Sequence, residues 1–221
     1  MVLPQFEYLA PKTIGEACNL LLELGSTARV MAGATDLIPP MKDKVISPEY
    51  IIDLKKIPGL DYLEYDDREG LKIGALTTLR TIETSPLVKE KNPAVAHAAK
   101  VVASTQIRTK GTMAGNICNA SPSCDTAPNL LAQGAKILVQ GPNKDRVIQI
   151  EDFFLGVKKT SLEPGEIVTG TGAPVSVTLA PGILSNIFDG IERPLSEIAK
   201  GSGYYISRGI SVNSLDTDKK W

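Results

Sequence analysis

Hydrophobic positions along residues 1–168 switch between helical and strand spacing. Apolar residues recur every three or four positions between Ala17 and Leu24, directly after the capping-box sequence Thr13-Ile14-Gly15-Glu16. This pattern predicts an amphipathic helix over residues 13–24. A second helix is predicted over the alanine-rich residues 92–104, and a third is predicted to begin with Asp125 as its cap and to run through Leu131.

Short apolar runs between turn sequences predict several strands. One strand is expected at residues 50–53, and a hairpin is expected where residues 61–65 and 71–75 flank Asp-Asp-Arg-Glu-Gly. Residues 136–140 and 146–150, joined through Gly-Pro-Asn, predict a second hairpin. Helices mixed with hairpins favour an α+β architecture over a doubly wound sheet.

Composition narrows the classes of partner. The chain has 221 residues, 43% of them hydrophobic and 22% charged, with a net charge of −1, enough to bury one core and a small appendage. The near-zero charge and the lack of a basic run argue against nucleic acid and anionic membranes as partners. Neither a membrane-spanning apolar stretch nor a signal-peptide pattern is present in the sequence, so a cytoplasmic protein is predicted.

Two loops of small residues are the strongest chemical signal. They read VMAGATDL at residues 30–37 and KGTMAGNICNASPSCD at residues 110–125. Small side chains leave backbone N–H groups open to an anion, and a following helix N-terminus adds partial positive charge. Neither loop has Walker A or Rossmann spacing. Phosphate binding and ordinary turn and cap glycines are both consistent with either loop taken alone.

The remaining reactive side chains have plain interpretations. Cys18, Cys118 and Cys124 lack the spacing of a zinc or iron–sulfur site and are expected to be packing residues. His97, the only histidine, falls within the alanine-rich helix and is expected to be a packing or surface residue. Arg108 precedes the second loop; it either steers an anionic cofactor or forms a structural salt bridge.

Six collinear blocks carry a family resemblance: FEYLAPKTIGEACNLL, MAGATDLIPPMK, YIIDLKKIPGL, LKIGALTT, ASTQIRTKGTMAGNICNASPSCDTAPNLLAQGA and FFLGVKKTSLEPGEI. With these blocks, residues 1 to about 168 resemble the FAD-binding medium subunit of molybdenum hydroxylases of the xanthine dehydrogenase, carbon monoxide dehydrogenase and 4-hydroxybenzoyl-CoA reductase types. The resemblance implies a PCMH-type FAD-binding fold of two small α+β subdomains, residues 1–55 and 56–168, without the family's C-terminal subdomain.

The same resemblance implies FAD as the cofactor, with its diphosphate gripped by both loops. The residues carried over to this role are Ala32, Gly33, Ala34, Thr35, Asp36, Thr112, Gly115, Asn116 and Asp125. The family often has adjacent glycines in each loop, where this chain has Ala34 and Ala114. A methyl group at those positions is expected to fit if φ is negative.

The implied function is electron transfer. In such complexes a molybdopterin-containing large subunit oxidises the substrate, a [2Fe-2S] small subunit passes electrons on, and FAD in the medium subunit delivers them to an acceptor. No residue here is arranged as a catalytic acid, base or nucleophile, so the chain is not expected to be active alone. Because the C-terminal subdomain helps to cover the flavin, weak or absent FAD retention is expected.

The last segment points to another family. Residues 169–221 contain PGILSNIFDGIERPL, ISRG and LDTDKKW, which resemble the catalytic A subunit of V-type and archaeal-type rotary ATPases. No Walker A loop occurs in it, so no ATP hydrolysis is expected. The alternatives to a flavoprotein are therefore a fragment that interacts with rotary ATPase subunits, or a non-functional composite. A strand at 174–179 and a helix at 183–199 are predicted, while irregular structure is favoured by Gly170, Gly172, Gly182, Gly201, Gly203 and Gly209.

Overall fold

A parallel sheet forms the N-terminal part of the fold in the computed structural model, which describes residues 3–173. Its strand order is β1-β3-β2, with both outer strands parallel to the central one. The bounds are β1 Glu7–Leu9, β2 Ala28–Met31 and β3 Tyr50–Asp53. The predicted strand at 50–53 is thus confirmed, and it occupies the centre of this sheet.

Helix α1 (Ile14–Leu24) packs against the parallel sheet and confirms the first predicted helix. Thr13 Oγ1 accepts a hydrogen bond from Glu16 N at 3.2 Å, and Glu16 Oε2 accepts one from Lys12 N at 2.9 Å. These bonds satisfy N–H groups that a helix start leaves without partners. Ala17 and Cys18 are fully buried on the inner face. The short helices η1 (Gly25–Thr27), α2 (Ile38–Lys42) and η2 (Leu54–Lys56) connect the strands.

An antiparallel sheet of five strands forms the second layer, in the order β4-β5-β10-β6-β7. Both predicted hairpins are present, the first as β4 (Leu63–Asp66) with β5 (Gly70–Gly74). The second joins β6 (Lys136–Gln140) to β7 (Asp145–Gln149). Strand β10 (Ile167–Ala173) lies between the two hairpins and is antiparallel to both of its neighbours.

The expectation that Gly170 and Gly172 favour irregular structure is wrong, because both pair within β10. Tyr62 gives the physical reason for the first glycine. A Cβ atom on Gly170 would overlap with Tyr62 Oη and would lie 3.0 Å from Ile73 O. Glycine therefore makes room for an aromatic side chain in the middle of the sheet.

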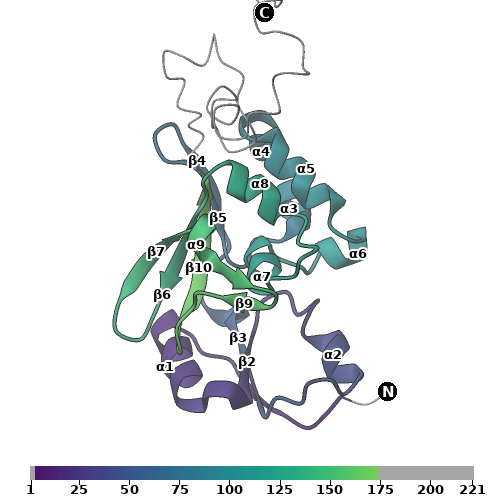
Figure 1. Cartoon of the computed structure of the whole chain (residues 1–221), viewed down its shortest axis with the longest axis vertical. Helices are drawn as coiled ribbons and strands as arrows, with labels where there is room; N and C mark the ends of the chain where they lie inside the picture. The colour runs from purple at the N-terminus through teal and green to yellow at the C-terminus, as the bar shows by residue number, and fades with distance from the viewer. Residues whose placement is uncertain (1–2, 174–221) are drawn as a thin grey trace, which may run out of the picture. The chain divides into compact units, whose positions relative to one another are not determined.

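Helices cover one face of the antiparallel sheet (Figure 1). They are α3 (Leu79–Thr84), α4 (Pro86–Lys91), α5 (Pro93–Val101), α6 (Thr105–Arg108), α7 (Met113–Cys118), α8 (Ala127–Ala132) and α9 (Ile150–Phe153). A small hairpin, β8 (Phe154–Gly156) with β9 (Lys159–Thr160), follows α9. A hydrophobic core lies between the antiparallel sheet and these helices. It includes Leu71 and Ile137 from the sheet and Val95 and Ile117 from the helices, all fully buried.

Helix α5 confirms the predicted alanine-rich helix but ends at Val101, because Val102 is already extended with a ψ of 115°, and Ala103 then adopts a left-handed φ of 44°. The prediction that Asp125 caps the next helix is wrong. Thr126 occupies that position, and its side chain makes no capping bond.

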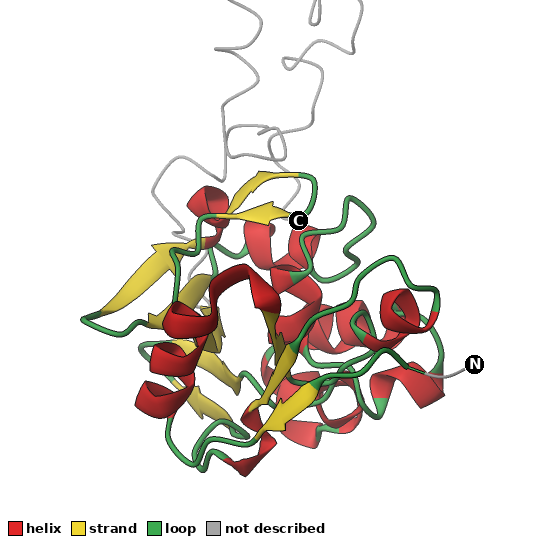
Figure 2. Ribbon diagram, turned by 90° about the horizontal axis from the view of Figure 1, so that it is seen from below, coloured by secondary structure: helices red, strands yellow, loops and turns green. Residues whose placement is uncertain are grey.

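The described fold is a mixed α+β structure, as expected from the sequence; its helices and strands are coloured separately in Figure 2. Strand β10 continues the antiparallel sheet to Ala173. The division into subdomains of residues 1–55 and 56–168 remains a prediction. The strand predicted at 174–179, the helix predicted at 183–199 and most of the ATPase-like segment lie outside the described residues. None of the helices within residues 3–173 is both long and apolar enough to cross a membrane.

Candidate cofactor site

The two small-residue loops meet at Gly33. The first loop connects β2 to α2, and the second leads into α7. A Cβ atom on Gly33 would overlap with Lys110 O and would lie 2.8 Å from Gly111 Cα. Thr35 Oγ1 also lies 3.4 Å from the position of a Cβ on Gly111. Glycine at position 33 therefore lets two segments that are distant in sequence pack backbone against backbone.

The first loop presents a row of backbone donors. Within the described part of the chain, the N–H groups of residues 33–36 donate to no protein acceptor. The carbonyl of Ala34 instead accepts from Leu37 N at 3.2 Å and from Ile38 N at 3.0 Å. Free N–H groups held in consecutive positions by such a turn suit an anion with several oxygens.

Ala34 departs from the expectation for a tolerated methyl group. Its φ is 64°, in the left-handed region, where a Cβ atom crowds the backbone at a cost of about 1–2 kcal/mol. Ala114, by contrast, lies inside α7 and is 5% exposed, so its methyl group packs into the core. The two alanines for which a negative φ was expected are thus in different situations.

The second loop uses part of its hydrogen-bonding capacity internally. Thr112 Oγ1 caps α7 by accepting from Gly115 N at 3.0 Å, and Thr112 O accepts from Asn116 N at 3.0 Å. The hydroxyl hydrogen of Thr112 remains able to donate while its oxygen accepts. Helices α2 and α7 have 5 and 6 residues, so their dipoles contribute less than the sequence suggested.

Two carboxylates accompany the loops. Asp36 is exposed next to Thr35, whose Oγ1 lies 3.4 Å from Asp36 Oδ2. Asp125 is also exposed and follows Cys124, whose thiol bonds to Asn116. A carboxylate beside an anion site is suited to accept hydrogen bonds from sugar or ribitol hydroxyl groups. Asp125, the last residue of the second loop, is therefore held near Asn116 through its neighbour Cys124.

Arg108 belongs to the framework under the second loop. It is 8% exposed, its Nε lies 3.0 Å from Glu83 Oε2, and its Nη1 donates to the carbonyls of Val102 and Ala103. Burial raises the pKa of Glu83, but hydrogen bonds from Arg80 and Arg108 outweigh burial and lower it. Of the two interpretations, the structure supports the salt bridge.

His97 is exposed on α5, which agrees with a surface role.

The three cysteines are free thiols, and Cys18 and Cys124 are buried. Burial, together with Asp145 and Glu166, raises the pKa of Cys18 to about 11, and burial raises that of Cys118 to about 12. Both thiols are thus protonated near neutral pH and act as small packing groups. Among the described residues, no cluster of three or more His, Cys, Asp or Glu could hold a metal ion.

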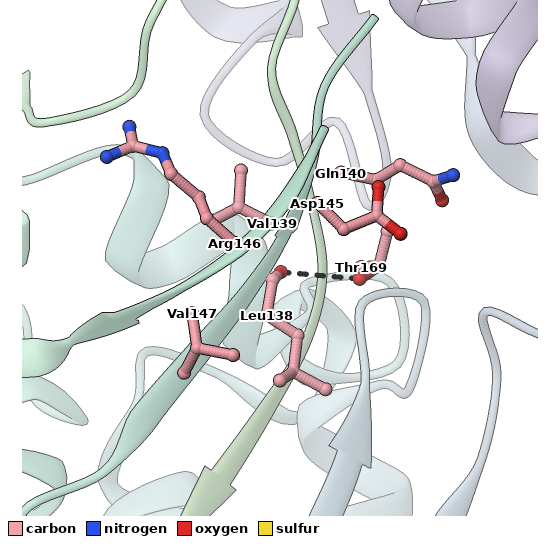
Figure 3. A pocket seen from close by; sticks show the side chains of 7 residues that line it. All are labelled: Leu138, Val139, Gln140, Asp145, Arg146, Val147 and Thr169. Atoms are coloured by element: carbon pink, nitrogen blue, oxygen red, sulfur yellow. Dashed lines mark hydrogen bonds between the residues drawn. The ribbon is translucent and has the colours of Figure 1, made fainter. Parts of the chain in front are cut away.

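One surface hollow lies between β6, β7 and β10 (Figure 3). Thr169 Oγ1 donates to Leu138 O there at 3.3 Å, and Arg146 and Asp145 project to opposite sides of β7. The Arg146 guanidinium is already paired with Glu166. None of the residues predicted to bind the cofactor lines this hollow.

The family of this chain follows from sequence comparison. The family described as "FAD binding domain in molybdopterin dehydrogenase" matches residues 4–176. The chain belongs to this family. Its cofactor is FAD.

Relatives of this FAD-binding domain include medium chains of several dehydrogenases. The carbon monoxide dehydrogenase medium chain of Hydrogenophaga pseudoflava is 38% identical over 174 residues, which are 79% of this chain and 60% of the relative. The glyceraldehyde dehydrogenase medium chain of Sulfolobus acidocaldarius is 31% identical over 209 residues, 95% of this chain and 69% of the relative. The chain spans about 60% of the length of the first of these relatives.

The fold also matches a solved structure. A chain of the carbon monoxide dehydrogenase from Hydrogenophaga pseudoflava, in a form lacking the Mo-pyranopterin moiety of the molybdenum cofactor, aligns with a TM-score of 0.77 and 37% identity. The alignment covers 80% of this chain and 62% of that chain. The mixed α+β fold is therefore shared with a carbon monoxide dehydrogenase.

The predicted ATPase-like tail gains no support from these comparisons. The alignment with the glyceraldehyde dehydrogenase medium chain covers 95% of this chain, whereas the family match stops at residue 176. Part of the segment beyond residue 176 therefore aligns with a medium chain. The ATPase resemblance remains a prediction about residues that lie mostly outside the described range.

Proposed function

We propose that this FAD-binding domain holds the FAD diphosphate between its two small-residue loops. The observation that carries the proposal is the row of unpartnered N–H groups at residues 33–36, beside the contact of Gly33 with Gly111. Hydrogen bonds to a charged group contribute about 1.5–3 kcal/mol each. Several such bonds can hold a diphosphate without a lysine.

The side chains around the loops complete the proposed site. The Thr112 hydroxyl and the Asn116 amide supply donors to phosphate or ribitol oxygens, while Asp36 and Asp125 accept from cofactor hydroxyl groups. Ala32, Ala34, Thr35 and Gly115 shape the loops around the diphosphate. Bound FAD supplies the exchange between one-electron and two-electron transfer. The protein binds and orients it and requires no acid or base of its own.

The proposed biological role is that of a medium subunit in a molybdenum hydroxylase. Its partners are a molybdopterin-containing large subunit and a [2Fe-2S] small subunit, and electrons pass from the iron–sulfur clusters through FAD to an acceptor. Support comes from relatives named as medium chains of carbon monoxide and glyceraldehyde dehydrogenases. Co-expression with candidate subunits tests this role, and isolation of the chain without them under mild conditions would contradict it.

Reconstitution tests the loop site directly. The purified full chain is titrated with FAD, and binding is measured by the quenching of flavin fluorescence, which also detects the weak binding expected from the sequence. Gly33→Ala places a methyl group against Lys110 O and is expected to abolish FAD binding. Gly15→Ala is the matched control, because a Cβ atom there meets nothing within 4 Å.

Circular dichroism of both variants separates loss of the site from loss of the fold. A folded Gly33→Ala variant that binds FAD as tightly as the Gly15→Ala control would overturn the proposed site. A folded wild-type chain that shows no FAD binding at any FAD concentration in the titration would overturn the proposed function.

A further inference from the structure

The side-chain amide of Asn116 is held in a single orientation by two neighbours. Its Oδ1 accepts a hydrogen bond from Thr126 Oγ1 at 2.6 Å and lies 3.0 Å from Cys124 Sγ. The hydroxyl and the thiol both carry a hydrogen, and the amide oxygen is the acceptor that both can reach. Thr126 is 0% exposed, so no water competes for its hydroxyl group.

This orientation decides where the other end of the amide faces. With Oδ1 turned toward Thr126, the NH2 group is directed away from it, and no described residue accepts a hydrogen bond from Asn116 Nδ2. Asn116 is partly exposed on α7, one residue after Gly115. The amide therefore presents two donor hydrogens beside the second loop.

We infer that Thr126 is a positioning residue for the cofactor: its buried hydroxyl group holds the Asn116 amide so that Nδ2 faces FAD oxygens. This inference rests on the proposed function. Without the Thr126 hydroxyl, the amide can rotate and present Oδ1, an acceptor, to a phosphate that is itself an acceptor. Cys124 provides a second, weaker donor in the same direction.

A purely structural role for Thr126 predicts something different. Thr126 lies directly before α8 and makes no capping bond there. If its hydroxyl group only stabilised the fold, its loss would lower the melting temperature and would weaken FAD binding only as far as the fold weakened. The positioning role instead requires that Thr126 acts on FAD affinity through Asn116.

The test measures the FAD dissociation constant of the full chain and of its variants by quenching of flavin fluorescence. Thr126→Val is expected to weaken binding about tenfold, the equivalent of one hydrogen bond, and Thr126→Ser is expected to restore it. In the Asn116→Ala background, Thr126→Val is expected to cause no further loss. Thr77→Val is the control, because Thr77 is also 0% exposed but donates to Tyr62 O at 2.7 Å.

Equal affinity of the wild type and Thr126→Val would overturn the positioning role and leave the loop site intact. A full additional loss in the Asn116→Ala background would also overturn it. Loss of affinity in Thr77→Val equal to that in Thr126→Val would assign the effect to stability.

A second measurement does not depend on FAD. In 1H–15N spectra of the cofactor-free chain, the Asn116 side-chain amide is assigned by its absence in Asn116→Ala. Its two resonances are expected to move or broaden in Thr126→Val and to stay in place in Thr126→Ser and Thr77→Val. Unchanged resonances in Thr126→Val would overturn the inference even if FAD binds. Absence of FAD binding in a wild type whose resonances respond as expected would instead reject the proposed function.

Discussion

Arg146 and Glu166 form a two-pronged ion pair, with the Nε and Nη2 groups of the arginine each 2.6 Å from a carboxylate oxygen of the glutamate. Arg146 lies on the edge strand β7, and Glu166 immediately precedes the central strand β10. Arg146 also donates to Ser161 O at 2.8 Å. The pair therefore ties the outer hairpin to the segment that enters the centre of the sheet.

Removal of the arginine is expected to destabilise the fold. Arg146→Met leaves the Glu166 carboxylate, which is 4% exposed, without its partner, and we expect a loss of about 2–3 kcal/mol in unfolding free energy. Lys72→Met is the matched control, since the Lys72–Glu69 pair is exposed and is worth at most about 1 kcal/mol. Urea denaturation measures both, and equal losses would contradict the prediction.

The same ion pair makes stability depend on pH. Hydrogen bonding from Arg146 lowers the pKa of Glu166 below its ordinary 4.5, although burial opposes this effect. Because the folded pKa is below the unfolded one, the stabilisation is present above the unfolded pKa and is lost as pH falls through the folded pKa. Unfolding free energy is therefore expected to drop on acidification below pH 4.5. Glu166→Gln should flatten this part of the pH profile, and an unchanged slope would exclude Glu166 as its source.

Ala34→Gly is expected to stabilise the protein. A φ of 64° is strained for alanine but not for glycine. The substitution removes this strain, and it also makes the unfolded chain more flexible, which lowers stability. The first contribution is expected to exceed the second by about 0.5 kcal/mol. Ala32→Gly is the control, because Ala32 has no positive φ and is expected to lose about 0.5 kcal/mol. Thermal denaturation compares the two variants, and a destabilised Ala34→Gly would show that the methyl group makes compensating contacts.

Local sequence patterns predicted much of this fold, because helix caps and hairpin turns are determined by residues that are close together in the sequence. The cap at Thr13 and the turn residues of both hairpins act within a few positions, and each formed where expected. The end of α5 was not predicted, because neither the extended backbone of Val102 nor the left-handed φ of Ala103 has a signal in its residue type.

The sequence predicted the two loops of the candidate site, but it could not predict that they contact each other. The small residues around Gly33 and Gly115 indicated backbone exposure, whereas the contact of Gly33 with Gly111 joins segments far apart in the chain. The bond from Thr126 to Asn116 could not be predicted, because threonine carries no spacing signal for it. Both contacts depend on how separate segments pack in the folded chain, which local sequence patterns do not report.

Gly170, on the central strand β10, allows a direct test of whether the Tyr62 side chain requires a glycine at this position. Gly170→Ala drives a Cβ atom into Tyr62 Oη and is expected to cost about 1–3 kcal/mol. Gly172→Ala is the matched control on the same strand, since its nearest neighbour, Leu71 O, lies 4.0 Å away. Tyr62→Phe in the Gly170→Ala background removes the overlapping oxygen and should recover part of the loss. If Gly170→Ala and Gly172→Ala unfold at the same urea concentration, Tyr62 does not impose the glycine, and the strand itself would tolerate a side chain there.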